Sequence, residues 1–247
     1  RRREPKPIST NNTNKPRNSR LMIFDLDLGP LWLTLQLAGA TVIVLLLVGT
    51  PIAWWLAFTS SRLRTIVEAI VALPIVLPPT VLGFYLLIAL GPHGFLGSPW
   101  KDLTGSTLSF TFTGLVIAST FYSLPFVVQP LHGAFESVGK KPLEAAWALG
   151  ASRLDTFLTV ASPMALRGYL TAIVLGFAHT LGEFGVVLMV GGNIPGQTKV
   201  LSIAIYDHVE VLEYAQAHTL SLGLLIFSFV VLLAVYTANR RLPLHAT

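Results

Sequence analysis

The chain has 247 residues, of which 53% are hydrophobic and 12% are charged, and its mean hydropathy is +0.66. A water-soluble globule is excluded as the leading interpretation, because such domains carry about 25% charged residues. The sequence contains no cysteine, which excludes a disulfide scaffold, a thiolate metal site and a cysteine nucleophile. The net charge of +5 does not indicate nucleic acid, because residues 1–21 hold seven basic residues and one acid, and the remainder sums to −1.

Long uncharged runs determine the predicted architecture. A helix needs about 20 residues to cross a hydrocarbon core of about 30 Å. Such runs extend over 28–61, 69–100, 103–135 and 214–239, and a further run over 168–198 is interrupted only by Glu183. The sequence predicts an all-α, polytopic membrane protein with five transmembrane helices, at 31–58, 67–90, 107–129, 167–190 and 217–238.

The basic residues predict the orientation, because cytoplasmic loops retain lysine and arginine. Eight lie on one side of the predicted spans and two, Lys101 and Lys199, on the other. The eight are Arg62, Arg64, Lys140, Lys141, Arg153, Arg167, Arg240 and Arg241. The C-terminus is therefore expected in the cytoplasm. The basic residues 1–21 would then lie outside, so we interpret them as a disordered or non-native extension of a single transmembrane domain, 22–247.

The most informative segment is the cytoplasmic loop 136–166. It carries small residues together with apolar ones at helical intervals, a pattern that needs a partner surface when it is exposed to water. We interpret it as a helix-turn-helix presented to a cytosolic protein. The residues predicted to make this contact are Glu144, Ala145, Ala146, Trp147, Leu149, Gly150, Arg153 and Pro163.

This loop resembles the coupling loop of the inner-membrane permease subunits of ATP-binding cassette importers. Glu144, Ala145, Ala146, Gly150, Val160 and Pro163 fit the spacing of the family pattern, and Ser162 replaces its usual leucine. Four further segments are similar to molybdate permeases, and the resemblance runs from about residue 31 to residue 241. They are LPIVLPPTVLGFYLL (73–87), GPHGFLG (91–97), FAHTLGEFG (177–185) and GGNIPGQTKVLSIAIY (191–206).

The resemblance implies a type I importer permease fold and a homodimer in the inner membrane of a prokaryote, surrounded by lipid. It also implies two copies of a cytosolic ATPase, which would hold ATP and magnesium, and an external molybdate-binding protein. The loops 91–106 and 191–216 are then expected to dock that protein, with His93, Lys101, Asn193 and Lys199 as candidate contacts. Tungstate is a second expected cargo, and a sulfate or thiosulfate permease is the alternative.

Polar and helix-breaking residues mark a candidate pathway. Pro78 and Pro79 remove backbone donors within the second span, which favours a broken helix, and Pro125 is expected to disturb the third. No lysine or arginine lies within a predicted span, so we expect neutral donors to line a weak path. These donors are Thr80, Ser119, Thr120, His179 and Thr180. A carboxylate at Glu183 would repel an anion, so we expect Glu183 to bond at a helix contact or gate, either protonated or paired with His179 one turn earlier. The remaining candidate is Gly83.

Catalysis by this chain is not expected. Residues 133–141, GAFESVGKK, only approximate a phosphate loop, because a lysine stands where a serine or threonine should hold magnesium. The six histidines show no metal-ligand spacing, so no metal or other cofactor is expected in this chain. An ion channel and a membrane-embedded enzyme remain alternatives, and co-purification with an ATPase would discriminate against both.

Overall fold

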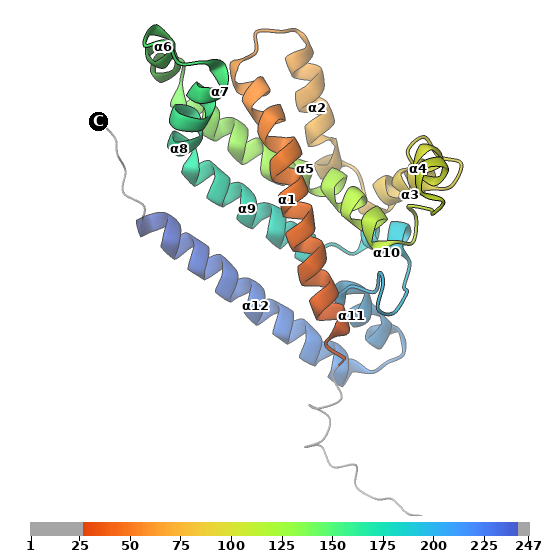
Figure 1. Ribbon diagram of the computed structural model, residues 1–247. Coiled ribbons are helices and arrows are strands. Elements are labelled where there is room, and N and C mark those ends of the chain that lie inside the picture. The colour runs from red at the N-terminus through yellow and green to blue at the C-terminus, as the bar shows by residue number, and fades with distance from the viewer. Residues whose placement is uncertain (1–26, 242–247) are drawn as a thin grey trace, which may run out of the picture.

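The computed structural model describes residues 27–241, and within them every regular element is a helix (Figure 1). The long elements are α1 (Gly29–Phe58), α2 (Leu63–Val76), α3 (Pro79–Leu90), α5 (Phe112–Val138), α9 (Leu166–Leu181) and α12 (Tyr214–Arg241). The short ones are α4 (Gly97–Thr104), α6 (Lys141–Ala148), α7 (Arg153–Thr156), a π-helical turn (Phe157–Ala161), α8 (Ser162–Met164), α10 (Gly185–Gly191) and α11 (Leu201–Glu210). The predicted extension 1–21 lies outside the described residues.

The all-α, polytopic architecture predicted from the sequence is confirmed. Three helices, α1, α5 and most of α12, are long and apolar enough to cross a membrane, and two sharply bent helix pairs raise the number of candidate spans to five. The bent pairs are α2 with α3, at 115°, and Arg153–Met164 with α9, at 74°.

The second predicted span is two helices rather than one. Its first helix begins four residues early, at Leu63, and ends at Val76, and α3 starts at Pro79. Pro78 and Pro79 remove two consecutive backbone donors, and Leu77 and Pro78, which each precede a proline, adopt extended backbone with ψ of 137° and 136°. The prediction of a continuous span was therefore wrong here, whereas the expected break at the proline pair is confirmed.

The third and fourth predicted spans also differ from the structure. Helix α5 runs unbroken through Pro125 and Pro130 to Val138, nine residues beyond the predicted end. The expected disturbance at Pro125 did not end the helix, because α1 and α9 pack along α5 and support it. The fourth span ends at Leu181 and resumes as α10 at Gly185, so Glu183 lies in a break and not at a helix centre.

Helices α1, α5 and α9 pack closely because small residues face their neighbours. A β-carbon on Gly168 would lie 2.2 Å from Ala134 Cβ, and one on Gly176 would lie 2.7 Å from a Val127 methyl group. Gly168, Ala172 and Gly176 recur every four residues and are buried, so they form one small-residue face of α9 against α5. Close backbone approach of this kind drives helix association in lipid.

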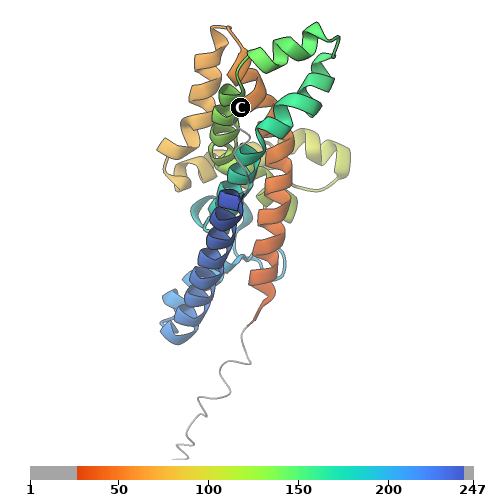
Figure 2. The same ribbon diagram turned by 90° about the vertical axis from the view of Figure 1, so that its left-hand side faces the viewer.

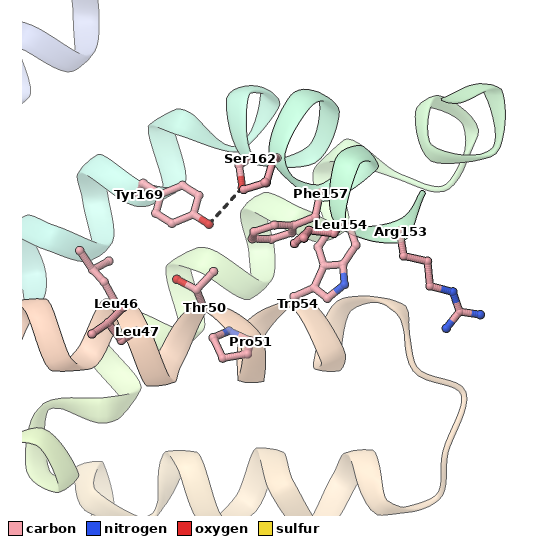
Figure 3. A pocket seen from close by; sticks show the side chains of 11 residues that line it. Leu46, Leu47, Thr50, Pro51, Trp54, Arg153, Leu154, Phe157, Ser162 and Tyr169 are labelled. Carbon is pink, nitrogen blue, oxygen red and sulfur yellow. Dashed lines mark hydrogen bonds between the residues drawn. The ribbon is translucent and has the colours of Figure 1, made fainter. Parts of the chain in front are cut away.

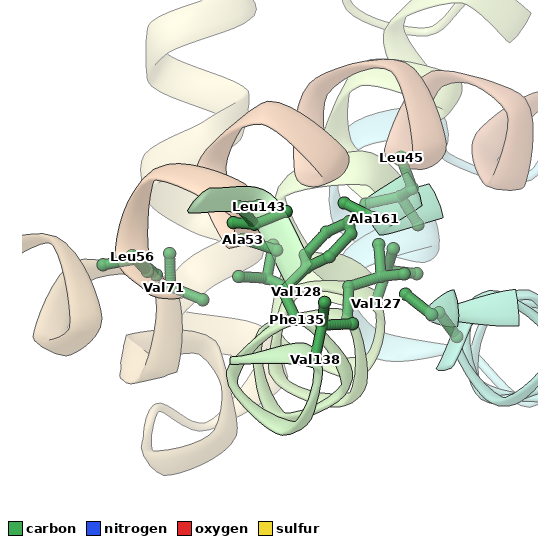
Figure 4. Packing of buried hydrophobic residues seen from close by; sticks show 13 residues of the cluster. Leu45, Ala53, Leu56, Val71, Val127, Val128, Phe135, Val138, Leu143 and Ala161 are labelled. Atoms are coloured by element: carbon green, nitrogen blue, oxygen red, sulfur yellow. The ribbon is translucent and has the colours of Figure 1, made fainter. Parts of the chain in front are cut away.

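The largest core cluster joins the spans to the loop that follows α5. Val127, Val128 and Phe135 of α5 meet Leu45 and Ala53 of α1 (Figure 4). Leu143 of α6 and Ala161 of the π-helical turn belong to the same cluster and are at most 1% exposed. The loop is therefore packed onto the spans as part of the same body.

Elements α6 to α8 lie at one end of α5 and α9, and α10 and α11 lie at the other (Figures 1 and 2). Helix α12 returns along the molecule, and only 6% of its most apolar stretch is buried within the chain. The α6 to α8 end carries Lys140, Lys141 and Arg153, three of the basic residues from which the sequence predicts the cytoplasmic side.

Candidate functional site

The predicted coupling loop is a helix-turn-helix, as its sequence indicated. The chain enters α6 through Pro142, which is suited to a first helical turn, and Glu144 places a negative charge near the helix N-terminus. Gly150 then adopts φ of +88°, and its N–H donates to the Trp147 carbonyl. Ser152 caps α7 by accepting a bond of 3.2 Å from the Asp155 N–H.

Apolar side chains of this loop face away from the protein. Trp147 is 46% exposed, Leu149 is 90% exposed and Leu154 is 67% exposed. The other predicted contact residues are exposed too, except Ala146, which is half-buried. They are Glu144, Ala145, Gly150, Arg153 and Pro163. Exposed apolar groups gathered on one short loop are typical of a protein-binding surface.

A pocket of about 670 Å³ opens between part of the loop and α1 (Figure 3). Its walls are mostly apolar, with Leu46, Leu47 and Pro51 of α1 on one side and Phe157 and Leu154 on the other. The hydroxyl groups of Ser162 and Tyr169, which also line the pocket, lie 3.4 Å apart (Figure 3). The Arg153 side chain extends away from the other lining residues (Figure 3). Beside the pocket the loop stays in contact with α1, because the rings of Trp54 and Phe157 lie with their centroids 5.1 Å apart.

The second candidate site is the place where the two broken spans meet. A β-carbon on Gly185 would lie 2.8 Å from Pro79 Cβ, so the start of α10 touches the start of α3. A pocket of about 560 Å³ opens beside this contact. Its lining includes four of the predicted pathway residues, Pro79, Thr80, His179 and Glu183, which the fold therefore brings together.

Hydrogen-bond directions determine what His179 offers to this pocket. The Thr180 hydroxyl donates to the Gly176 carbonyl at 2.9 Å, so in its 3.1 Å contact with Ser123 it accepts. The Ser123 hydroxyl proton is thereby used, and Ser123 accepts from His179 Nδ1 at 2.9 Å. A neutral His179 then has an unprotonated Nε2. The expectation that neutral His179 donates to an anion does not fit this arrangement.

Glu183 is 3% exposed, and neither carboxyl oxygen has a hydrogen-bond partner among the described residues. The predicted pairing with His179 is wrong, because the histidine Nδ1 binds Ser123 and its ring stacks on Phe126 at 3.8 Å. The Ser119 hydroxyl lies near the Glu183 carboxyl group, but the two groups do not have the geometry of a hydrogen bond. An ionised Glu183 would repel an anion in the pocket.

The other predicted pathway residues lie beside the pocket. Thr180 is buried between α9 and α5, Gly83 packs on Met189 and Val186 of α10, and Pro78 precedes α3. Sequence reasoning missed Tyr122, whose ring lies 4.7 Å from that of His179 and which lines the pocket. The two glycines of the LGEFG segment, Gly182 and Gly185, were the available signal for the break.

Two of the predicted docking residues are held within the chain. Asn193 donates to both carboxylate oxygens of Asp207, at 2.8 and 2.9 Å, and Lys199 forms an ion pair with the same carboxylate. Partial burial acts to raise the pKa of Asp207, but the bonds from Lys199 and Asn193 outweigh it and hold that pKa below its ordinary value. His93 and Lys101 lie on the separate segment around α4 and are exposed.

Residues 27–241 contain no group of three or more histidine, aspartate or glutamate side chains placed to hold a metal ion.

Comparison with known proteins establishes the family. A model of the family described as "Binding-protein-dependent transport system inner membrane component" matches residues 49–242, which is most of the chain. The chain belongs to this family. The inner membrane component is also 60% identical over 214 residues to the molybdenum transport system permease protein ModB of Azotobacter vinelandii, covering 87% of this chain and 95% of that protein.

Two further relatives are each 35% identical to this inner membrane component. The Escherichia coli K12 molybdenum transport system permease protein ModB is 35% identical over 178 residues, covering 72% of this chain and 78% of that protein. A Nephroselmis olivacea protein named "Probable sulfate transport system permease protein cysT" is 35% identical over 187 residues, covering 76% of this chain and 66% of that protein.

The fold of the inner membrane component matches solved transporter structures. A bacterial ABC transporter that imports the acidic polysaccharide alginate has a chain of the same fold, with a TM-score of 0.73. The match covers 90% of this chain and 82% of that chain at 17% identity. The type I importer permease fold implied by the sequence resemblance is confirmed.

Proposed function

We propose that this chain is the permease subunit of an ATP-driven importer that carries molybdate across the inner membrane by alternating access. The observation that carries the proposal is the 60% identity to a molybdenum permease over 95% of that protein's length. The sulfate relative is 35% identical over fewer residues, so the cargo assignment favours molybdate. Tungstate is proposed as a second cargo, because it has the same charge and nearly the same shape.

The energy for transport comes, in this proposal, from a partner. Two permease chains form a homodimer, and each binds one copy of a cytosolic ATPase that holds ATP and magnesium. Trp147, Leu149 and Leu154 provide the apolar surface for docking, and burial of such groups supplies the affinity. Because Leu143 and Ala161 are part of the core of α1 and α5, displacement of the docked loop acts directly on the spans.

The opposite end receives an external molybdate-binding protein. The C-terminus is cytoplasmic in this topology, which places α4 and α11 outside. His93 and Lys101 are exposed on the α4 segment and are proposed contacts. Asn193 and Lys199 act indirectly, since both are engaged by Asp207 and shape the loop that precedes α11.

The proposed path lies beside the two broken spans. Thr80 and Tyr122 bring hydroxyl groups to the pocket, and its lining includes no lysine or arginine. A dianion that leaves water needs hydrogen-bond donors to replace its hydration shell, and the two hydroxyl groups replace only a small part of it. Binding in the membrane is therefore weak, and the affinity for molybdate comes from the external protein.

The proposal is tested by uptake in proteoliposomes that contain the permease, its ATPase and its binding protein. Labelled molybdate should accumulate only with ATP inside, and excess sulfate should not compete. Equal competition by sulfate would assign a sulfate permease instead. Accumulation without ATP would indicate a channel, and loss of uptake on omitting the binding protein is the control for dependence on it.

A further inference from the structure

The break between α9 and α10 is tied to a helix on the external side. Residues 182–184 interrupt the span. The N–H groups of Gly182 and Glu183 still bond carbonyls of the last turn of α9, and the Phe184 carbonyl accepts from the Leu188 N–H of α10. The Ser202 hydroxyl of α11 donates to the Glu183 carbonyl at 2.6 Å. This bond joins the pocket directly to the segment that follows the NIPG turn.

A second contact holds the next residue of the break. The rings of Phe184 and Tyr206 lie with their centroids 5.0 Å apart. Ser202 and Tyr206 are four residues apart, so they lie on the same face of α11. One face of α11 therefore holds two consecutive residues of the break, one through its backbone and one through its side chain.

Helix α11 is itself fixed at its start. The Leu201 N–H donates 2.8 Å to the hydroxyl of Thr34, which belongs to α1 and is 2% exposed. Val200 and Ile203 are buried in a cluster with Leu37 of α1. The opposite end of α11 and the turn after it, residues 209–214, are exposed. The exposed end of α11 therefore belongs to the same helix as the two residues that contact the break.

We propose that Ser202 is a positioning residue, which makes α11 and the Glu183 break move as one unit when the external binding protein docks. The inference rests on the proposed function and adds a route by which docking outside reaches the pocket. Thr34 is the fixed point of this unit on α1. The route needs no displacement of α1, since Ser202 and Tyr206 contact the break itself.

The test uses the complete importer in proteoliposomes. Ser202→Ala removes the hydroxyl that binds the Glu183 carbonyl, and Ser202→Thr keeps a hydroxyl. We expect Ser202→Ala to lower the stimulation of ATP hydrolysis by the loaded binding protein about fivefold, the factor that corresponds to one lost hydrogen bond. Hydrolysis without the binding protein should stay at the wild-type rate, and Ser202→Thr should restore the stimulation.

Thr219→Ala is the matched control. Among the described residues the Thr219 hydroxyl bonds only the Ala215 carbonyl of its own helix. The substitution therefore removes a hydroxyl group near the same end of the molecule without breaking a contact between helices. Stimulation should be unchanged in this variant. Equal stimulation of Ser202→Ala and wild type would overturn the inference, and so would equal losses of basal and stimulated hydrolysis. A wild-type importer without stimulation or uptake would instead overturn the proposed function itself.

A labelling experiment measures the movement of the break directly. The chain contains no cysteine, so Met189→Cys introduces a single thiol into the pocket lining. Docking of the binding protein should change its rate of reaction with a maleimide, and Ser202→Ala should abolish that change. An undiminished change in the Ser202→Ala background would contradict the proposed route.

Discussion

Gly150 is the residue on which the turn of the coupling loop depends. Its φ is +88°, and a β-carbon at this position would meet nothing within 4 Å. Backbone conformation, and not space, therefore requires glycine here. Residues with a β-carbon lose about 1–2 kcal/mol in the left-handed region.

We expect Gly150→Ala to disturb the turn between α6 and α7 and to weaken binding of the ATPase. A cost of about 1–2 kcal/mol corresponds to a five- to thirtyfold loss of the docking-competent loop. Co-purification of the ATPase and ATP-dependent uptake measure the effect. Gly133→Ala is the control, because it adds the same methyl group to a helical position with open space. Equal behaviour of the two variants would show that the turn does not set docking.

Asp207 gives a prediction about pH. Its pKa lies below the ordinary value of 3.8, because hydrogen bonds from Lys199 and Asn193 outweigh the effect of burial. A depressed folded-state pKa contributes stability that is present above the unfolded pKa and is lost as pH falls through the folded one. The loop 193–199 should keep its hydrogen-exchange protection down to about pH 4 and lose it at lower pH.

Asp207→Asn tests this assignment. The variant removes the ion pair with Lys199, so exchange protection of residues 194–199 should be low at every pH. Hydrogen exchange with mass spectrometry measures both profiles. Glu210→Gln on the same helix is the control, since Glu210 is exposed and makes no ion pair among the described residues. An Asp207→Asn profile that matches wild type would show that another contact holds the loop.

At the scale of elements, two breaks create the pocket. Pro78 and Pro79 end α2, and Gly182 with Gly185 separates α9 from α10. The shortened pieces α3 and α10 then pack on each other, so neither span is independent of the other. Broken helices in membranes occur where a pathway is lined, and here they bring Thr80 beside Glu183.

The contact between α3 and α10 depends on Gly83. A β-carbon there would lie 2.9 Å from Met189 Cβ and 3.2 Å from the Val186 Cα, and the backbone atom cannot turn away. Gly83→Val should therefore separate α3 from α10 and destabilise the protein by about 1–3 kcal/mol. Thermal unfolding in detergent and uptake measure the two effects.

Gly39→Val is the control for Gly83→Val. Gly39 lies in α1, and a β-carbon there meets nothing within 4 Å. Its unfolding temperature should stay near that of wild type. If Gly83→Val unfolded at the wild-type temperature and transported normally, α3 and α10 would not need close contact.

At the scale of the whole molecule, selectivity is expected to lie outside the spans. The pocket is lined without a fixed cation, so it offers little to distinguish one tetrahedral dianion from another. A binding protein that prefers sulfate but keeps the docking surface should therefore make the same permease transport sulfate. Uptake of labelled sulfate by the hybrid importer is the measurement.

The hybrid must be shown to work before its cargo is judged. Binding of sulfate, binding to the permease and stimulation of ATP hydrolysis are the three controls. A hybrid that passes all of them and still moves no sulfate would reveal a selective site in the spans, and Thr80 and Tyr122 would be the first residues to replace.

The sequence by itself determined the all-α, membrane-spanning fold class and the helix-turn-helix form of the segment predicted to contact an ATPase. Long uncharged runs identify membrane-spanning segments, because a charge in the hydrocarbon core is costly. The spacing of small and apolar residues in 140–163 predicts helices because it depends only on neighbours along the chain. Pro78 and Pro79 predicted their break for the same reason, since a missing N–H acts within one turn. The resemblance carried by these segments led to the correct family.

Only the tertiary structure decided which polar groups meet. Glu183 was expected to pair with His179 one turn away, but Ser123, on a different helix, binds the histidine. The bond from Ser202 to the Glu183 carbonyl likewise joins segments on either side of a turn. Periodicity fixes neighbours along one helix, whereas contacts between helices depend on where small residues such as Gly176 and Gly185 allow backbones to approach, and that is a property of the packed molecule.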